Sequence, residues 1–413
     1  MPTSISFARV ISIGVPQFGA PAVAGTIPPT IGTFLYLQTL ALMRMSLTST
    51  IPSTITLLTN LEKLYLTSNQ LAGPLPNAIG SLSKLQYLGL SYNLLTGTLP
   101  STIGSMTAAL HVTLNNNVLA GSIPSEIGLM KNLENLFLDN NRIEGPMPLT
   151  IGSLSKLQTL SVGNNLLTGA IPSTIGTMTS LVTIALSRNT LTGTIPSTIG
   201  SLTNLLILQF YSNIIGGSLP SSIGSLSKLT YLEANLNRLS GALPSTIGSM
   251  TSLHELHINN NMLSGSIPSS IGSLTNLVEL TLVSNNIGGS LPITIGSLSK
   301  LQYLGLSSNF LTGVIPSTIG LMTALTEVHL GSNSLRGTIP SEIGLLTNLV
   351  HLYTYSNSIE GSLPPSIGSM TKLESLLMYN NLLTGEIPST IGTMTALSII
   401  QLQNNLLAGT IVE

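Results

Sequence analysis

Apolar and polar residues follow one pattern along the chain, and this pattern repeats every 24 residues. In the copy that begins at Leu85, apolar residues stand at Leu85, Leu88 and Leu90, and a polar stretch around Asn93 follows. Leu88 and Leu90 are two residues apart, which is the spacing that places side chains on one face of a β-strand. We therefore predict a short strand in each copy, with these leucines buried and residues 87, 89 and 91 facing outward.

The repeat continues through almost the whole chain. An asparagine recurs in fifteen consecutive copies from Asn69 to Asn405, and a proline recurs in sixteen copies from Pro28 to Pro388. Because one such turn cannot bury its own leucines, neighbouring turns must share a core. The sequence therefore predicts a solenoid whose strands stack into a parallel sheet.

The motif LxxLxLxxNxLxGxLPxxIGxM, read from Leu85 to Met106, resembles the leucine-rich repeat. Its GxIPxxIG half is similar to the plant-type subclass found in receptor-kinase ectodomains and polygalacturonase-inhibiting proteins, and the resemblance covers residues 25–411. It implies an α/β repeat solenoid, a right-handed superhelix of about 16 turns, with a concave parallel β-sheet and a convex side of short turns and 3-10 segments. It also implies an extracellular or cell-surface location and non-enzymatic recognition of a protein, a peptide or a glycan.

Each recurrent residue has a physical reason. Asn93 ends the strand, where its amide group can bond backbone groups of its own turn and of a neighbouring turn. Gly97 and Gly104 permit backbone conformations that a side chain would oppose. Pro100 fixes φ on the return side of the turn. Together these residues predict an asparagine ladder and a tightly closed turn.

The two ends depart from the pattern. We expect residues 1–60 to form degenerate N-terminal capping turns and residues 61–413 to form regular repeats in one continuous domain. Residues 1–24 look like a half-turn over the first strand, because Ile13, Phe18, Val23 and Gly25 fall in register with Leu61, Leu66, Leu71 and Gly73. Arg9, residues 10–15 and residues 22–24 loosely mimic a signal peptide, although Gly25 already stands at a repeat position. Because residues 410–413 stop inside a further turn without a cap, we expect stacking, a partner or a continuing chain there.

Composition narrows the choice of partner. Charged residues make up 7% of the 413 residues and the net charge is -1, which argues against binding to nucleic acid. Polar residues interrupt every apolar run before 18 residues, so we expect no membrane insertion. The chain has no cysteine, which excludes disulfides and thiolate metal sites. We expect no cofactor.

A longer period of 72 residues lies on top of the first. Lysines recur at this spacing, and the intervening turns carry a different local motif, so the chain consists of about five copies of a three-turn block. The pattern indicates expansion by duplication of blocks. The lysines are Lys84, Lys156, Lys228, Lys300 and Lys372.

Outward-facing strand residues vary between copies, which is typical of a binding surface but also of drift after duplication. Tyr353, Tyr355 and Tyr379 with His351 are predicted to lie on adjacent strands and to form an amphipathic platform suited to a peptide or a sugar. The alternative is that these tyrosines stack only on each other.

A second cluster on the predicted face is acidic and consists of Glu233, Glu255, His257 and Glu279. Glu255 and Glu279 occupy the same column one turn apart, so we expect one carboxyl pKa to be raised. Paired carboxylates also describe a retaining glycosidase, but an open sheet offers no pocket that excludes water, so we predict no catalytic residues. His254 and His257 are three residues apart and face opposite ways on a strand, so we predict no metal site.

The convex side carries a hydroxyl two residues after the recurrent proline in thirteen of sixteen turns. Such a rank of threonines is similar to the surface of ice-binding proteins, which gives an alternative function. Capping of short turns and copying by duplication explain the rank equally well. The alternative ice-binding residues are Thr102, Thr150, Thr174, Thr198, Thr246, Thr294 and Thr318.

Overall fold

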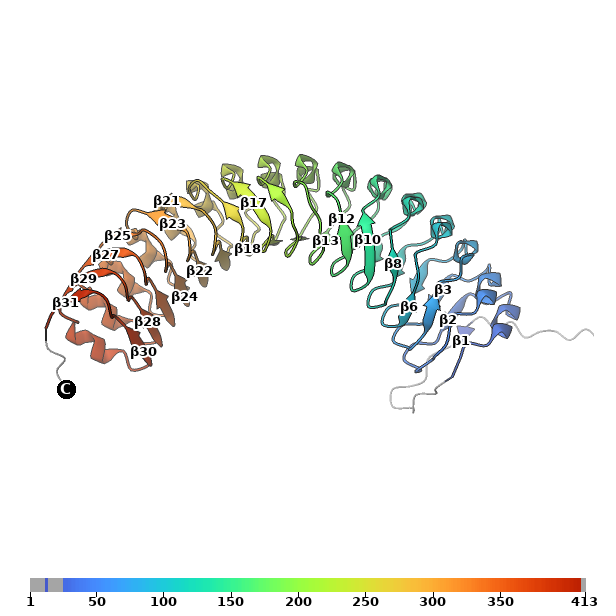
Figure 1. Cartoon of the computed structure of the whole chain (residues 1–413), viewed down its shortest axis with the longest axis horizontal. Helices are drawn as coiled ribbons and strands as arrows, with labels where there is room; N and C mark the ends of the chain where they lie inside the picture. The colour runs from blue at the N-terminus through green and yellow to red at the C-terminus, as the bar shows by residue number, and fades with distance from the viewer. Residues whose placement is uncertain (1–11, 14–24, 410–413) are drawn as a thin grey trace, which may run out of the picture. The chain divides into compact units, whose positions relative to one another are not determined.

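The computed structural model describes residues 12–13 and 25–409, which fall into two compact units, residues 1–192 and 193–413. In each unit every turn of the chain contributes one short strand to a parallel sheet and one 3-10 helix to the opposite side, as Figure 1 shows. Within each unit the layer of paired strands is called the inner sheet, and the 3-10 helices form the opposite layer. The predicted leucine-rich-repeat solenoid is confirmed.

The strands of the inner sheet pair in chain order within each unit. In the first unit they are β1 (Ser12–Ile13), β2 (Thr39–Ala41), β3 (Lys63–Tyr65), β5 (Tyr87–Gly89), β7 (His111–Thr113), β9 (Asn135–Phe137), β11 (Thr159–Ser161) and β13 (Thr183–Ala185). In the second unit they are β14 (Ile207–Gln209), β16 (Tyr231–Glu233), β18 (Glu255–His257), β20 (Glu279–Thr281), β22 (Tyr303–Gly305), β24 (Glu327–His329), β26 (His351–Tyr353), β28 (Ser375–Leu377) and β30 (Ile399–Gln401).

Burial along these strands follows the alternation in the sequence. Leu232, at the centre of β16, is fully buried; Leu256 of β18 lies opposite it, and Leu280 of β20 lies opposite Leu256. The residues on either side of each leucine face outward and are partly exposed. The predicted division between a leucine core and an outward-facing strand surface is therefore confirmed.

A second set of short strands follows the asparagine in most turns and was not predicted. These segments pair in small parallel groups beside the inner sheet. In the first unit they are β4 (Ala72–Pro74), β6 (Leu94–Thr96), β8 (Ala120–Gly121), β10 (Arg142–Pro146) and β12 (Leu166–Thr168). In the second they are β15 (Gly216–Gly217), β17 (Arg238–Gly241), β19 (Met262–Leu263), β21 (Gly288–Ser290), β23 (Phe310–Thr312), β25 (Arg336–Gly337), β27 (Ser358–Gly361), β29 (Leu382–Gly385) and β31 (Leu406–Leu407).

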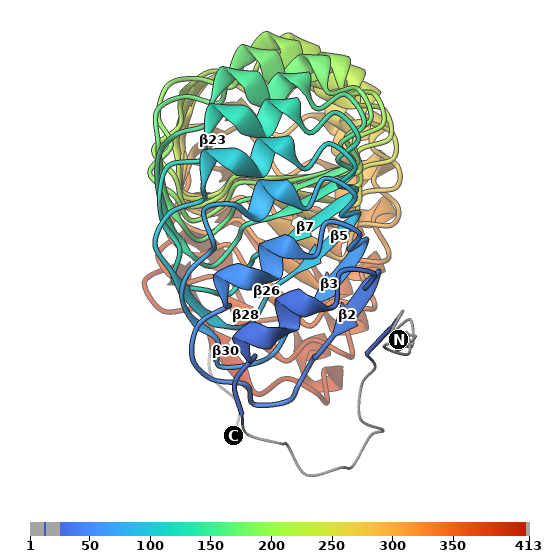
Figure 2. The ribbon, with the colours of Figure 1, turned by 90° about the vertical axis from the view of Figure 1, so that its right-hand side faces the viewer.

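A 3-10 helix begins after the recurrent proline in nearly every turn, and Figure 2 shows these helices stacked in a row beside β2, β3, β5 and β7. Pro100 has φ -68° and its carbonyl accepts a hydrogen bond from the Ile103 N–H at 3.0 Å. The first unit has η1 (Pro29–Thr33), η2 (Ser53–Leu57), η3 (Ile79–Ser81), η4 (Ser101–Ser105), η5 (Ser125–Leu129), η6 (Leu149–Ser153) and η7 (Ser173–Thr177). The second has η8 (Ser197–Ser201), η9 (Ser221–Ser225), η10 (Ser245–Ser249), η11 (Ser269–Ser273), η12 (Ile293–Ser297), η13 (Ser317–Leu321), η14 (Ser341–Leu345), η15 (Pro365–Ser369) and η16 (Ser389–Thr393).

The asparagine ladder is present in both units. In the second unit, the Asn285 side-chain amide donates to the carbonyls of Ile258 and Leu282, each at 3.0 Å, and its Oδ1 accepts from the Leu263 N–H at 3.0 Å. Asn93 makes equivalent bonds in the first unit. Each ladder residue thus satisfies backbone groups of its own turn and of the preceding turn, as predicted.

Two kinds of glycine close the turn for different reasons. Gly97 has φ +74°, a conformation that opposes a side chain. Gly104 has no such φ, but a Cβ there would collide with the carbonyl oxygen of Glu126 in the next turn. The residue just before each ladder asparagine also adopts a left-handed conformation, and at Leu236 (φ 57°) it does so with a bulky side chain. This last feature was not predicted, because the residue type varies between turns.

The lysines of the 72-residue period have a shared structural role. Lys300 Nζ donates to Asn276 Oδ1 of the preceding turn at 2.8 Å, and Asn276 Nδ2 donates to the Thr251 carbonyl at 2.9 Å. The same lysine-to-asparagine bond recurs at Lys84, Lys156, Lys228 and Lys372. The 72-residue period therefore places a lysine beside an asparagine of the neighbouring turn, outside the strands of the inner sheet.

The N-terminal turns differ in one respect from the prediction. β1 lies parallel to β2, but Ile13 is opposite Leu40 and not opposite Leu37, the residue that the repeat period assigns to it. Gly25 does stand at the repeat's glycine position. Its carbonyl accepts a hydrogen bond from the Thr48 N–H, and the Ser49 carbonyl, one repeat later, accepts the equivalent bond from the Ala72 N–H. The boundary at residue 60 stays a prediction, and Phe18, Val23, most of the stretch that resembles a signal peptide, and residues 410–413 lie outside the described residues. In the described part, no helix has the length and apolar character needed to cross a membrane.

Candidate binding surface on the concave face

All eight side chains predicted for the concave site lie in the second unit. They belong to strands β16 to β28 or to the residues just after these strands, and the strand residues among them flank the buried central residue of each strand. The outward-facing side chains of β16, β18, β20, β22, β24, β26 and β28, together with Tyr355 and Tyr379, are called the strand face below. The structure brings these side chains together as an acidic group and two groups of rings.

The first group of rings runs across three strands. The Tyr303 and His329 ring centroids are 5.1 Å apart, those of His329 and Tyr353 are 4.6 Å apart, and those of His351 and Tyr353 are 5.7 Å apart. All four side chains are half-buried. Of these residues, Tyr303 and His329 were missed in the sequence. The sequence could have indicated these contacts, because residues one or two repeats apart occupy the same position on neighbouring strands. Tyr303 and His351 therefore lie in one column across the sheet, and His329 and Tyr353 lie in the adjacent column.

The second group consists of Tyr355 and Tyr379. Their rings are parallel to within 5° and their centroids are 4.9 Å apart. The predicted contact between tyrosines of adjacent turns therefore exists. This contact joins two of the four side chains of the predicted platform. The other two, His351 and Tyr353, belong to the first group of rings.

Glycines on the sheet let some of these rings lie flat. A Cβ at Gly331 would lie 2.5 Å from Cζ of Tyr355, so the Tyr355 ring rests against the backbone of the preceding turn. A Cβ at Gly305 would lie 2.6 Å from Cε1 of Tyr303. The Tyr355 ring therefore covers backbone with one face, and the Tyr303 side chain lies against the backbone of its own strand.

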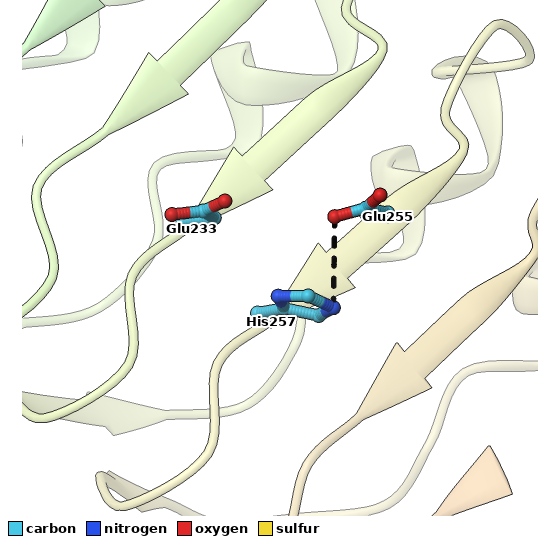
Figure 3. A group of neighbouring side chains, drawn as sticks. All are labelled: Glu233, Glu255 and His257. Carbon is cyan, nitrogen blue, oxygen red and sulfur yellow. Dashed lines mark ion pairs between the residues drawn. The ribbon is translucent and has the colours of Figure 1, made fainter. Parts of the chain in front are cut away.

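The acidic group is centred on His257. Its Nε2 lies 3.1 Å from Glu279 Oε2 and 3.9 Å from Glu255 Oε2. Figure 3 shows that Glu233 comes from the strand beside the one that carries Glu255 and His257, and that the three side chains stand on the same side of the sheet. The pairing of β18 with β20 places Glu255 opposite Glu279, as predicted.

Burial and a neighbouring carboxylate both affect the pKa of Glu255 in this group. The pKa of Glu255 is raised above its ordinary value, first by burial and then by the Glu279 carboxylate, while His257 acts in the opposite direction. The predicted direction is therefore confirmed, although burial contributes more than repulsion.

The ring group contains a second histidine paired with a carboxylate. His329 Nε2 lies 3.1 Å from Glu327 Oε2. Burial nevertheless lowers the pKa of His329, and it outweighs the effect of Glu327, which raises it. His329 therefore acts mainly as a neutral ring that stacks between two tyrosines.

Three of the acidic-group residues can approach one metal ion. One ligand atom from each of Glu233, Glu255 and His257 lies within 4.8 Å of the others. His254, which we did not expect to share a metal site with His257, is not one of these three residues. Its Nδ1 lies 2.8 Å from the Ser252 carbonyl oxygen. Carboxylates and imidazole are ligands that suit a divalent transition metal, but these side chains are partly exposed and already pair among themselves.

The first unit carries a smaller ring cluster that the sequence analysis also missed. Tyr87 stacks on His111 with centroids 4.5 Å apart and contacts Tyr65 at 6.1 Å. Lys63 Nζ lies 5.5 Å from the centre of the Tyr87 ring. This cluster is therefore paired with a cation.

The convex hydroxyl rank takes part in hydrogen bonds between turns. Thr246 Oγ1 donates to the Ser221 carbonyl at 2.6 Å, and Thr318 Oγ1 donates to the Ile293 carbonyl at 2.7 Å. We expected Thr198 and Thr246 to be exposed; Thr198 is exposed, whereas Thr246 is half-buried. These bonds give the rank a structural role, and the ice-binding hypothesis stays an untested alternative. The same bond is made by Thr102, Thr150, Thr174 and Thr294.

Comparison with protein families identifies the repeat. A model described as leucine rich repeat matches residues 36–95 and 131–191, and a second model of the same description matches residues 252–274, 300–322 and 372–394. No curated protein sequence matches the chain significantly.

Many solved structures share this fold, and receptors are prominent among them. A TDR receptor is 33% identical, and the match covers 92% of this chain and 66% of the receptor chain with a TM-score of 0.84. The plant peptide hormone receptor RGFR1 in complex with RGF2 is 34% identical over 94% of this chain and 70% of that one, with a TM-score of 0.79. The ectodomain of the Arabidopsis receptor kinase HAESA with an IDA peptide hormone is 32% identical over 93% and 64%, with a TM-score of 0.85. This chain thus spans about two thirds of the length of these relatives.

A plant ice-binding protein is also similar in structure. It is 24% identical over 61% of this chain and 84% of its own length, with a TM-score of 0.50. This likeness shows a shared fold alone.

Proposed function

The chain belongs to the leucine-rich repeat family, and we propose that it is a non-enzymatic recognition protein that binds a peptide segment on the strand face of its second unit. The observation that carries this proposal is the gathering of two groups of rings on that face, with the Tyr355 and Tyr303 rings lying over glycines. Flat aromatic surface with a polar hydroxyl is typical of recognition sites, because it offers contact area with little loss of side-chain entropy.

Two of the relatives support a peptide over a glycan as partner. The RGFR1 and HAESA structures each contain a peptide hormone, and the HAESA structure is of an ectodomain. An extracellular or cell-surface location for this chain is part of the same proposal. The open sheet favours binding without catalysis, since its carboxylates are partly exposed.

The test compares binding by wild-type protein and by a variant in which Tyr353, Tyr355 and Tyr379 are replaced by Ala, on a peptide array and a glycan array. We expect wild-type protein to retain peptides that the variant loses. A matched control replaces Tyr65, Tyr87 and Tyr92 of the first unit by Ala, which removes equal aromatic area from the other unit. The proposal is contradicted if the variant with Tyr353, Tyr355 and Tyr379 replaced by Ala retains the same peptides as wild type. Circular dichroism must show that this variant and the control variant are both folded.

A further inference from the structure

The strand face of the second unit has an unusual balance of charge. Its seven strands β16 to β28 contain Glu233, Glu255, Glu279 and Glu327 but no lysine, arginine or aspartate. In a chain with only 14 acidic residues against 13 basic ones, four glutamates on these strands are a local excess of negative charge.

The basic side chains of this unit lie elsewhere. Lys228, Lys300 and Lys372 donate to asparagine side chains of the preceding turn, and Arg238 and Arg336 stand on the second set of strands. Among the described residues of the strand face, histidines are the side chains that approach the glutamates: His257 lies near Glu255 and Glu279, and His329 near Glu327. The negative charge of the face is therefore not neutralised by permanent cations of the same face.

The first unit shows that this imbalance does not follow from the repeat itself. Its strands β3 to β13 occupy the same positions in the turn and contain Lys63 but no glutamate or aspartate, and the position just after the strand, which Tyr355 and Tyr379 hold in the second unit, carries one acidic residue, Asp139. The acidic character thus belongs to the part of the chain that also gathers the larger set of rings.

The acidic group and the rings are continuous. β20, which carries Glu279, pairs directly with β22, which carries Tyr303, and β24 places Glu327 opposite Tyr303 on one side and His351 on the other. A cation above these strands meets carboxylate oxygens and ring faces together. The guanidinium group suits this combination better than the ammonium group, because it is planar, stacks on aromatic rings and binds carboxylates through several N–H donors.

We propose that the strand face from β16 to β28 binds an arginine-containing basic peptide, with arginine side chains over Glu255, Glu279 and Glu327 and their flanking tyrosines. This proposal rests on the proposed function and specifies its partner class. Seven strands at about 4.8 Å spacing span about 29 Å, which an extended peptide of about nine residues covers at about 3.3 Å per residue.

The experiment selects peptides from a phage-displayed library of random dodecapeptides on the full chain, and then measures the affinity of the consensus peptide by fluorescence anisotropy. We expect the selected peptides to be enriched in arginine. Replacing arginine by lysine in the synthetic peptide weakens binding, replacing it by glutamine weakens binding further, and raising the NaCl concentration does the same.

A pair of matched variants separates the strand face from overall charge. The double variant Glu255→Gln and Glu279→Gln should weaken binding of the consensus peptide by roughly tenfold, since two carboxylate contacts are lost. The double variant Glu126→Gln and Glu342→Gln removes the same charge from η5 and η14 on the convex side and should leave the affinity unchanged.

The outcomes separate the two proposals. Selected peptides that depend on Tyr355 and Tyr379 but show no excess of basic residues, or that bind the Glu255 and Glu279 variant as well as wild type, overturn the basic-peptide inference and leave peptide recognition standing. Failure to select any peptide, or selection of peptides that ignore the tyrosine variant, overturns both.

Discussion

Replacing Asn285 by Leu tests how much one rung of the asparagine ladder contributes to stability. Asn285 is 5% exposed and makes four hydrogen bonds to backbone groups, of which the one to the Val283 carbonyl is the longest at 3.5 Å. The Ile258 carbonyl also accepts from Asn261, and the Leu282 carbonyl also accepts from Asn309, so both carbonyls keep one partner in the variant. The Leu263 N–H has Asn285 Oδ1 as its acceptor and becomes an unpaired buried donor.

The expected cost follows from this count. An unpaired buried donor costs about 1–3 kcal/mol, and each of the two shared bonds contributes about 0.5 kcal/mol or more, so the variant should lose about 2–4 kcal/mol of unfolding free energy. Urea unfolding followed by circular dichroism measures the loss. The neighbouring Asn286 is exposed, and Asn286→Ala is the control, with an expected change within about 0.5 kcal/mol. Equal midpoints for wild type and the Asn285 variant refute the ladder as a stabilising element.

Three further predictions concern single side chains. Leu236→Asn should raise the unfolding free energy by about 0.5–1 kcal/mol, because Leu236 has φ 57° and asparagine tolerates that conformation better; an unchanged melting temperature would argue against strain there. Thr354→Val should stabilise the chain by about 1 kcal/mol, because the Thr354 hydroxyl is buried in the core without a hydrogen-bond partner in the described part of the chain; destabilisation in urea unfolding would contradict this. The raised pKa of Glu255 means that the folded chain binds this proton more tightly than the unfolded chain, so stability falls as pH rises through the window between the ordinary and the raised pKa. Glu255→Gln should therefore be more stable than wild type at about pH 7 and lose this advantage by about pH 3, as calorimetry at both pH values can check.

The sequence predicted those parts of the structure that depend on one turn and its neighbour. The buried leucines, the ladder bonds of Asn93 and the 3-10 helix after Pro100 all follow from residues that must recur in each turn, because each turn has the same backbone groups to satisfy. Tyr355 and Tyr379 stand at the same position in consecutive turns, so their contact could also be predicted.

Other features were missed because they depend on side-chain orientation, on local backbone conformation or on how the turns stack, which the repeat pattern does not show directly. His329 stacks on Tyr303 of the preceding strand and on Tyr353 of the next, and both contacts depend on side-chain orientation across the sheet. The left-handed residue before each asparagine was missed because serine, arginine, tyrosine and leucine all occur there. The bonds of the convex threonines were missed because they depend on how one 3-10 helix stacks on the preceding one.

The most direct test of peptide recognition by the second unit is hydroxyl-radical footprinting of the full chain with and without the consensus peptide. Mass spectrometry then gives the oxidation rate of each tyrosine. Tyr303, Tyr353, Tyr355 and Tyr379 should be oxidised more slowly when the peptide is bound. Tyr36 and Tyr92 of the first unit, which are 68% and 57% exposed, serve as internal standards and should not change. Unchanged rates at the four strand-face tyrosines under saturating peptide would contradict the account.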